Sequence, residues 1–251
     1  MYSPGKTSSY PDEPVDKGLR YHFLGGGSEV GNVGIVLEGV KGDRLLIDYG
    51  LAPTDPPRYP AEAPKVSDVI VTHSHIDHIG MIPWISGSHH STLHATHVTV
   101  ALSELMWRDC HKVSRIEGYP LPWDKRDIDF ALESWKVHNF GEWVKHGNWK
   151  WRLHPAGHIP GAAMVEIDTG NKKVLLSGDF DTRDSSLVSG ALPVDVDILF
   201  VEGTYGGRTH PDKKSEMKRL IERIKEIKTR GGTVLIPAFA NGRGQDILMT
   251  L

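Results

Sequence analysis

The residues best suited to chemistry lie in one short stretch of the chain, residues 72–81, which reads T-H-S-H-I-D-H-I-G-M. The apolar run of residues 68–72 is typical of a buried strand, and residues 79–81 fit the first turn of a helix. The stretch is therefore predicted to lie where a strand turns tightly into a helix. Within six positions it holds three histidines and one aspartate, which are His73, His75, Asp77 and His78.

These four side chains suit a divalent metal ion. Because alternate residues of an extended segment project to one side, His73 and His75 can face one centre. Asp77 and His78, placed where the chain turns, can face a second centre a few ångströms away. Imidazole and carboxylate suit Zn²⁺, with Mn²⁺ or Fe²⁺ as weaker alternatives. The competing interpretation is a histidine-rich surface turn in a chain with 14 histidines, but this spacing after a buried strand favours a metal site.

The pattern H-x-H-x-D-H followed by Gly80 resembles the signature of the metallo-β-lactamase superfamily. The resemblance implies that His73 and His75 bind a first metal ion. Asp77 and His78 would then bind a second. It implies a dinuclear hydrolase holding two Zn²⁺ ions, with Mn²⁺ as the alternative, and it does not name a substrate.

Three further residues stand where the superfamily has its other motifs. Asp48 ends a predicted strand and matches the carboxylate that orients the ligand histidines without binding the metal itself. His158, placed between two glycines, matches a ligand of the first metal, although a lone histidine is more often structural. Asp179, after another predicted strand, matches the carboxylate that bridges two ions about 3.5–4 Å apart. Asp179 would thus serve both metals.

Two strings nearer the C-terminal end are similar to the β-CASP branch of the superfamily, whose members are nucleases. Glu202 precedes T-Y-G and resembles the first acidic motif of that branch, and residues 237–246, P-A-F-A-N-G-R-G-Q-D, resemble the opening of its inserted domain. The resemblance is greatest to the cleavage and polyadenylation specificity factor nucleases and their archaeal relatives, and smaller to ribonuclease J. It makes Glu202 a catalytic candidate beside Asp77 and His78, acting either on a ligand histidine or in proton transfer. Arg243 would contact the nucleic-acid backbone or form an ordinary surface salt bridge.

The resemblance implies an α+β fold, namely the N-terminal portion of a metallo-β-lactamase αββα sandwich followed by the start of a β-CASP α/β domain. We expect a flexible lead-in over residues 1–19, the metallo-β-lactamase segment over 20–208, and an incomplete β-CASP domain over 209–251. Family members continue well beyond this length and carry later histidine motifs, one of which completes the second metal site. The chain is therefore expected to be a fragment, which leaves the second site and folding in isolation open.

Hydrophobic periodicity supports this outline. The glycine-rich residues 25–31 are either a plain hairpin or a loop whose N–H groups face an anion. His89, His90, His94 and His97 match no ligand motif and are predicted to be structural or exposed. Helices are predicted over residues 99–116, 124–132 and 214–229, with a short one after the histidine cluster that is bracketed by Pro83 and Gly87. Strands are predicted over residues 21–24, 33–38, 44–48, 68–72, 91–95, 163–167, 172–177, 195–200 and 232–236, and as a meander over 135–138, 142–145 and 149–154.

The composition is that of an ordinary globular protein. The 251 residues carry a formal net charge of −3. This does not suggest a nucleic-acid-binding protein, but a local basic groove would be averaged away. The single cysteine, Cys110, excludes an internal disulfide framework and fits a reducing cytoplasm. No stretch approaches a membrane span, and the first residues lack the apolar core of a signal peptide.

Three functions stay open at this point. The first is a β-CASP ribonuclease, an endonuclease, a 5′→3′ exonuclease or both, in which two metals activate a water molecule and clamp the phosphate oxygens of single-stranded RNA. DNA is a less favoured substrate, and the enzyme would act alone, as a homodimer or in an RNA-processing complex. The second is a hydrolase of a small ester, thioester or lactam. The third is a non-catalytic partner subunit, which the intact metal motifs disfavour.

Overall fold

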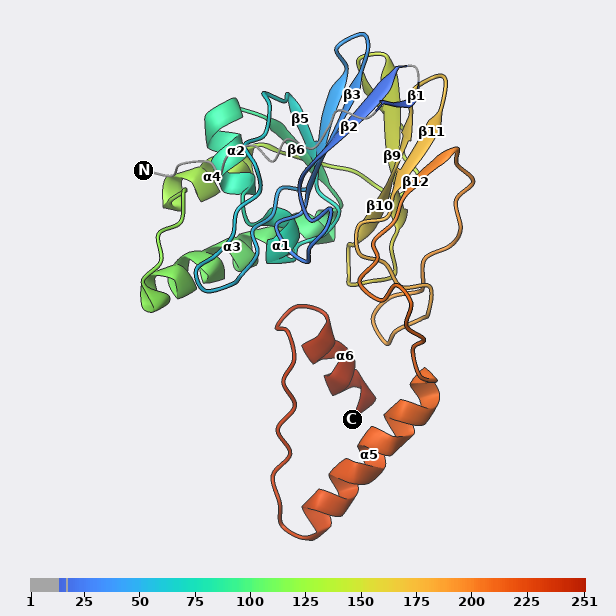
Figure 1. Ribbon diagram of the computed structural model, residues 1–251. Helices are drawn as coiled ribbons and strands as arrows, with labels where there is room; N and C mark the ends of the chain where they lie inside the picture. The colour runs from blue at the N-terminus through green and yellow to red at the C-terminus, as the bar shows by residue number, and fades with distance from the viewer. Residues whose placement is uncertain (1–13, 17) are drawn as a thin grey trace.

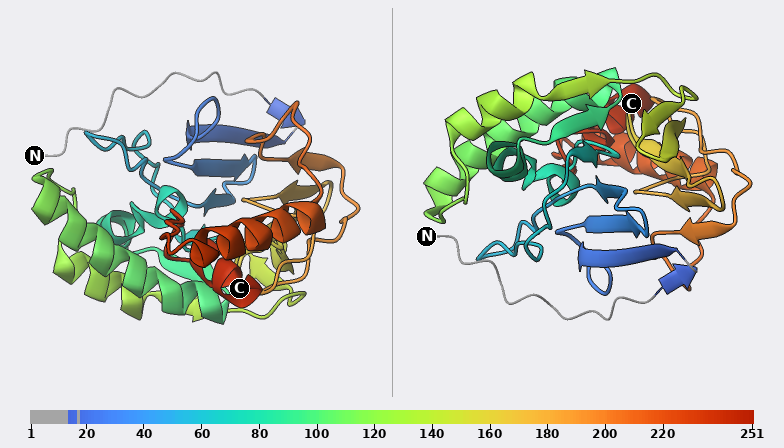
Figure 2. Two further views of the ribbon diagram at one scale, coloured as in Figure 1. Left: turned by 90° about the horizontal axis from the view of Figure 1, so that it is seen from below. Right: turned by 90° about the horizontal axis from the view of Figure 1, so that it is seen from above.

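Two β-sheets packed face to face form the centre of the fold, and four helices cover the outer side of the first sheet (Figures 1 and 2). The computed structural model describes residues 14–16 and 18–251. The first sheet has the order β1-β2-β3-β4-β5-β6-β7, antiparallel up to β4 and parallel from there. Its strands are β1 (Pro14–Asp16), β2 (Leu19–Gly25), β3 (Gly34–Gly39), β4 (Arg44–Ile47), β5 (Asp68–Ile70), β6 (Thr92–Ala95) and β7 (Trp135–Val137).

The second sheet has the order β12-β11-β10-β9-β8, and all its pairs are antiparallel except β11 with β12. Apolar and polar residues alternate along β9. Trp149, Trp151 and Leu153 are buried against the first sheet, and the residues between them face outward, so one face of the strand packs in the core. Its strands are β8 (Val144–His146), β9 (Trp149–Pro155), β10 (Ala163–Asp168), β11 (Lys173–Leu176) and β12 (Ile198–Phe200). The predicted α+β sandwich is thus confirmed.

The helices fix the turn that carries the histidine cluster. On the outer side of the first sheet, the indole N–H of Trp107 donates to the carbonyl of Ile79 at 2.9 Å, and that of Trp123 donates to the carbonyl of Gly80 at 2.7 Å. Both tryptophans are buried, so these bonds tie the turn to the apolar core. The helices on this side are α1 (Ile76–Ile79), α2 (Ile82–His89), α3 (His97–Glu117) and α4 (Lys125–Glu133).

The outer face of the second sheet is covered by loop segments. Ala156, Ile159 and Ala191 pack with Met164 of β10 and Leu175 of β11 in a separate apolar cluster. Two more helices, α5 (Lys213–Thr229) and α6 (Arg243–Thr250), lie beyond the end of the sandwich that carries α1 (Figure 1). No helix in the described part of the chain has the length and apolarity that crossing a membrane requires.

The structure corrects several predicted boundaries. Residues 14–16 and 19 were expected in a flexible lead-in, but 14–16 form β1, which pairs with β2, and β2 begins at Leu19. The rest of that lead-in, residues 1–13 and 17, lies outside the described residues. The helical turn at the cluster begins at Ile76 rather than after His78. Pro83 and Gly87 lie within α2 instead of bracketing a shorter helix, since proline is tolerated in a first turn.

Two predicted strand arrangements are wrong. The strand near residue 135 does not join a meander, because β7 pairs in parallel with β6 in the first sheet, whereas β8 and β9 form a hairpin in the second. Residues 232–236 form no strand, and Leu235 is 91% exposed. Local periodicity identifies strand-forming residues but does not supply the partner that a strand needs.

A chain of polar contacts joins the two sheets. Asp68 of β5 contacts His94 Nε2 at 2.8 Å and His146 Nδ1 of β8 at 3.3 Å, and His94 Nδ1 contacts His138 Nε2 at 2.9 Å. Burial alone would raise the pKa of Asp68, but hydrogen bonds with His146 and His94 outweigh it and lower that pKa. The hydrogen bond between Asp68 and His146 is also the largest cause of the raised pKa of His146. His94, expected to be structural, therefore takes part in a contact chain between the sheets.

We expect the contribution of His146 to stability to depend on pH. Its pKa is raised on folding, so the stabilising Asp68–His146⁺ pair is fully present below about pH 6.5 and is lost as pH rises through the folded-state pKa. His146→Gln should cost roughly 1.5–3 kcal/mol of unfolding free energy at pH 6 and clearly less at pH 8.5. Urea denaturation of wild type and variant at both pH values measures the difference, with the exposed His97→Gln as control. An equal loss at both pH values would contradict the assignment.

Candidate metal centre

The candidate site lies at one end of the sandwich, where strands of both sheets finish. Asp48 follows β4, the His73–His75 loop follows β5, and Asp179 follows β11. His158 lies in the loop between β9 and β10. Because the carboxyl ends of β4, β5 and β11 and the turn after β9 all reach this end, residues more than 100 positions apart come together. Asp77 and His78 belong to α1, and Glu202 follows β12.

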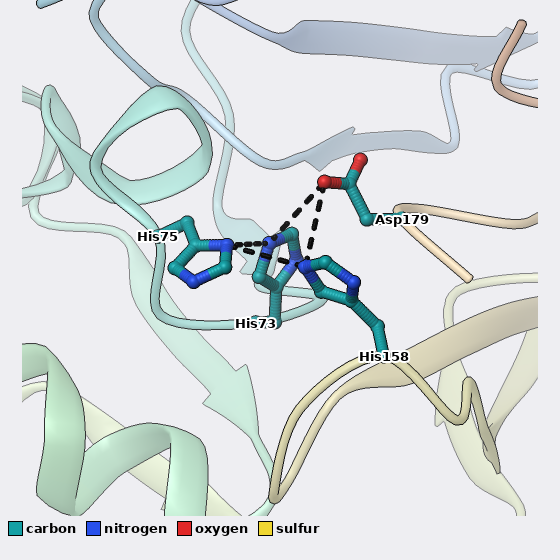
Figure 3. Close-up of side chains that lie close together, drawn as sticks. All are labelled: His73, His75, His158 and Asp179. Carbon is teal, nitrogen blue, oxygen red and sulfur yellow. Dashed lines mark hydrogen bonds and ion pairs between the residues drawn. The ribbon is translucent and has the colours of Figure 1, made fainter. Parts of the chain in front are cut away.

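Four of the predicted metal ligands form one compact group (Figure 3). His75 Nδ1 lies 3.1 Å from His73 Nε2 and 3.2 Å from His158 Nε2. Asp179 Oδ2 lies 3.8 Å from His73 Nε2 and 3.6 Å from His158 Nε2. All four donor atoms lie within 4.8 Å of one another, and no other such group occurs among residues 14–16 and 18–251.

The remaining ring nitrogens show which atoms are free to bind a cation. His75 Nε2 lies 3.3 Å from the carbonyl oxygen of Asn241, which can only accept, so this nitrogen carries the proton and Nδ1 carries a lone pair. Thr72 Oγ1 donates to Asp48 and therefore accepts from His73 Nδ1 at 3.1 Å, which leaves a lone pair on His73 Nε2. Lone pairs this close repel one another unless a cation lies between them. Three nitrogens and one carboxylate oxygen fit zinc.

The protonation states of these ligands agree with cation binding. Burial, followed by the neighbouring histidines, lowers the pKa of His73 well below its ordinary value. Burial also lowers the pKa of His158 to about 4, although Asp179 opposes the shift. Burial would raise the pKa of Asp179, but the hydrogen bond and charge of His78 outweigh it and lower that pKa to about 2. At neutral pH the two imidazoles are neutral and the carboxylate is ionised, which is the form that binds a metal ion.

The residues expected to hold a second ion, Asp77, His78 and Asp179, do not form a convergent group like that of the first set. His78 Nε2 lies 3.3 Å from Asp179 Oδ1 and 3.8 Å from Asp77 Oδ2. Burial opposes a charge on His78, but the charges of Asp48 and Asp77 and the bond with Asp179 outweigh it and raise its pKa well above the ordinary value. The same negative field that favours a charged His78 also favours a divalent cation near it. Asp179 is therefore in reach of both sets of ligands.

Asp48 orients the site from beneath. Its Oδ1 accepts from the backbone N–H of Thr72 at 2.7 Å, and its Oδ2 accepts from Thr72 Oγ1 and from His78 Nδ1, both at 2.7 Å. These bonds leave His78 Nε2 free to face the carboxylates. Asp48 is fully buried and has a φ of +56°, a left-handed conformation that aspartate adopts more readily than most residues. Asp48 is therefore hydrogen-bonded both to the loop that carries His73 and to the helix that carries His78.

Gly50 permits β4 and α1 to approach closely. A Cβ atom at this position would lie 1.6 Å from the carbonyl oxygen of Asp77. The backbone N–H of Tyr49 donates to the carbonyl of His78 at 2.8 Å, so the two segments are hydrogen-bonded across this contact. The absence of a side chain at Gly50 thus lets α1 lie directly against the end of β4.

A hollow of about 700 Å³ opens beside Asp77, His78 and Asp179. The glycine-rich loop of residues 25–31 forms one wall, and Asp77, Asp179 and Glu202 are among the residues that line it. Glu202 Oε2 accepts a hydrogen bond from the backbone N–H of Thr204 at 2.7 Å and is not the partner of a ligand histidine. Glu202 therefore faces the same space as the candidate ligands while its carboxylate stays half-exposed.

Arg243 lies at the first turn of α6 and is not among the residues that line this hollow. Its guanidinium is 58% exposed and lies 3.9 Å from Asp246. It is one of the charges that lower the pKa of His158, so it acts on the centre electrostatically. His154, four positions before His158, is not part of the group and contacts the buried Glu166 at 2.7 Å.

Three contributors to the site were not anticipated. Thr72 links Asp48 to His73, the carbonyl of Asn241 contacts His75 Nε2, and Ser74 accepts a hydrogen bond from the side chain of Asn241. A threonine and a serine flanking a histidine are too common to be singled out. Asn241 lies 166 positions from His75, and its contact is made by a backbone carbonyl, which any residue carries.

Comparisons with known proteins agree with this geometry. The sequence profile of the metallo-beta-lactamase superfamily matches residues 26–238. "Probable RNase MJ4" of Methanocaldococcus jannaschii is 33% identical over 241 residues, which cover 91% of this chain and 55% of that protein. "Cleavage and polyadenylation specificity factor 73" of Drosophila melanogaster is 33% identical over 251 residues, which cover 96% of this chain and 36% of that protein. The chain thus spans about half of the former and about a third of the latter.

The chain belongs to the metallo-beta-lactamase superfamily. A solved structure of a protein of unknown function from Enterococcus faecalis V583 superposes with a TM-score of 0.54 at 15% identity, covering 83% of this chain and 57% of that one, which agrees with the fold. Together with the convergent group of histidines and aspartate, the superfamily fold implies that a divalent metal ion is bound.

We expect Asp48→Asn to weaken metal binding without disturbing the backbone. Asparagine tolerates the left-handed conformation and can still accept from the N–H of Thr72, but its amide cannot accept from both Thr72 Oγ1 and His78 Nδ1. Loss of a residue that orients ligands typically lowers metal affinity about 10- to 100-fold. Competition with a zinc-binding dye measures the affinity. Asp43→Asn, which alters a carboxylate bound to Asn148 at a distant turn, is the control. Unchanged affinity in Asp48→Asn would refute the bracing role.

Gly50→Ala should destabilise the fold by about 1–3 kcal/mol or more, because the added methyl group overlaps the carbonyl of Asp77 and must displace α1. Gly42→Ala is the matched control, since a Cβ there meets no atom within 4 Å, although its φ of +84° carries a strain of its own. Urea denaturation of the two variants checks the difference. Equal stability of Gly50→Ala and wild type would show that β4 and α1 are not held in this contact.

Proposed function

We propose that the protein is a zinc-dependent ribonuclease of the β-CASP type that hydrolyses phosphodiester bonds of single-stranded RNA. The observation that carries this proposal is the convergence of His73, His75, His158 and Asp179 at 3.1–3.8 Å, from loops of both sheets. The names of the relatives, a ribonuclease and a cleavage and polyadenylation factor, support RNA rather than a small ester or lactam as substrate. In this reading residues 209–251 open the β-CASP domain.

The proposed ligands divide between two ions. His73, His75, His158 and Asp179 would hold the first, and Asp77, His78 and Asp179 would hold the second. Bound zinc ions supply Lewis acidity towards phosphate oxygens and lower the pKa of a water molecule towards neutrality. Manganese is the alternative for the same donor set.

The protein's own groups would prepare the site for this chemistry. Asp48 keeps the proton of His78 on Nδ1, so that Nε2 faces the reaction space. Glu202 lines the hollow but does not orient a histidine, and we assign it to proton transfer between the substrate and solvent. Arg243, which is exposed and does not line the hollow, would attract the RNA backbone. The hollow beside Asp77 and Asp179 would receive the scissile phosphate.

The proposal is tested by measuring bound metal and RNA cleavage on the same preparation. We expect inductively coupled plasma mass spectrometry to find zinc in the purified chain, and a 5′-labelled single-stranded RNA to be cut. His75→Ala and Asp179→Ala should each lose more than the ~10- to 100-fold in metal affinity that follows loss of an orienting residue, and cleavage should fall with it.

Three comparisons make the test specific. The exposed His97→Ala should retain both metal and cleavage. A DNA oligonucleotide of the same sequence and a panel of thioesters show whether the site prefers RNA. A chain that binds no metal would refute the metal centre. A chain that binds metal but hydrolyses only thioesters would refute the ribonuclease assignment.

A further inference from the structure

The segment after β12 is buried at only one point. Of residues 201–251, all of which are described, only Asn241 and Gly242 are buried. Their neighbour Phe239 is 78% exposed, and α5 and α6 have no buried residue. This buried point lies against the metal centre, whereas the hydrogen bonds of Lys213 with Asp184 and of Asp246 with Ser186 are exposed.

The turn at Asn241 contacts both histidine loops. The amide Nδ2 of Asn241 donates to Ser74 Oγ at 2.8 Å, and its carbonyl oxygen accepts from His75 Nε2 at 3.3 Å. Gly242, at φ +92°, lies so close to Ile159 that a Cβ would approach Ile159 Cγ2 to 2.4 Å. Ile159 directly follows His158. The turn therefore packs against the residues beside two of the four convergent ligands.

The turn is also rigid in itself. Gln245 accepts from the N–H of Gly242 at 2.9 Å and donates to the carbonyl of Ala240 at 2.7 Å. These two bonds fix the backbone on either side of Asn241, so its carbonyl has a defined direction. A fixed carbonyl holds His75 in the tautomer that carries the proton on Nε2, and that tautomer presents the Nδ1 lone pair to the other ligands.

We propose that Asn241 is a positioning residue of the metal centre, which anchors to Ser74 and so fixes the carbonyl that orients His75. The proposal rests on the metal centre of the proposed function, and extends it by making the segment of residues 239–245 part of the site. Docking of this segment and binding of the metal are then coupled, because each fixes the same imidazole ring.

The coupling is tested with a double-mutant cycle on the full 251-residue chain. Asn241→Ala and Ser74→Ala remove the same hydrogen bond from its two ends. We expect each to lower zinc affinity about 10- to 100-fold in competition with a zinc-binding dye, and the double variant to lose no more than one single variant. Thr250→Ala, which removes a hydrogen bond within α6 away from the centre, should bind zinc as wild type does.

A spectroscopic readout separates positioning from general loss of structure. In ¹⁵N-histidine NMR of the metal-free chain, His75 should show the single Nε2–H tautomer in wild type and Thr250→Ala, and a mixture of tautomers in Asn241→Ala and Ser74→Ala. Far-ultraviolet circular dichroism checks that all variants are folded. Ser74→Ala keeps the test valid if Asn241→Ala fails to fold.

The outcomes separate this inference from the proposed function. If wild type binds zinc and both Asn241→Ala and Ser74→Ala bind it equally well, the positioning role is wrong and the metal centre stands. If Thr250→Ala loses as much affinity as they do, the effect is structural and the positioning role is again wrong. If wild type binds no zinc, the metal centre is wrong, and the positioning role is refuted with it.

Discussion

The buried carboxylate of Asp48 accepts hydrogen bonds from three donors on the loop and helix that follow β5. Through the hydroxyl of Thr72 it determines which nitrogen of His73 is protonated, and directly it determines the same for His78. Two candidate ligands therefore owe their orientation to one buried side chain that is not itself a member of the convergent group. Burial of a carboxylate is costly unless its oxygens are hydrogen-bonded, so the same three bonds that satisfy Asp48 also arrange the site.

The metal-binding residues could be predicted from the sequence, but the contacts that hold them in position could not. The spacing around His73 and His75 is local, and the strand before it is strongly apolar, so the convergence of these rings could be anticipated. The pairing of β7 with β6 could not, because a periodic pattern does not say which sheet a strand joins. The contact from Asn241 could not either, since it is made by a backbone atom from a distant part of the chain.

The negative charge around the hollow determines the order in which metal ions and an anionic substrate would bind. Asp77, Asp179 and Glu202 line the hollow in which a phosphodiester anion would have to lie, and Asp48 lies directly beneath it. Without cations these carboxylates would repel a phosphate, and Arg243 is not among the residues that line the hollow. We therefore expect metal binding to precede binding of the proposed nucleic-acid substrate, because the two divalent ions of the proposed centre would reverse the local charge. The near-neutral net charge of the chain gives no sign of this local contrast.

The distance along the chain between His75 and Asn241 has a consequence for synthesis. The histidine loop leaves the ribosome early, His158 follows 83 residues after His75, and the carbonyl that restrains His75 is added 166 residues after it. Until then the imidazole ring of His75 is free to exchange its proton between nitrogens. The sandwich can thus form around a centre that is not yet organised, and we expect the ring to become fixed only after residue 241 has been added and has folded back onto the histidine loop.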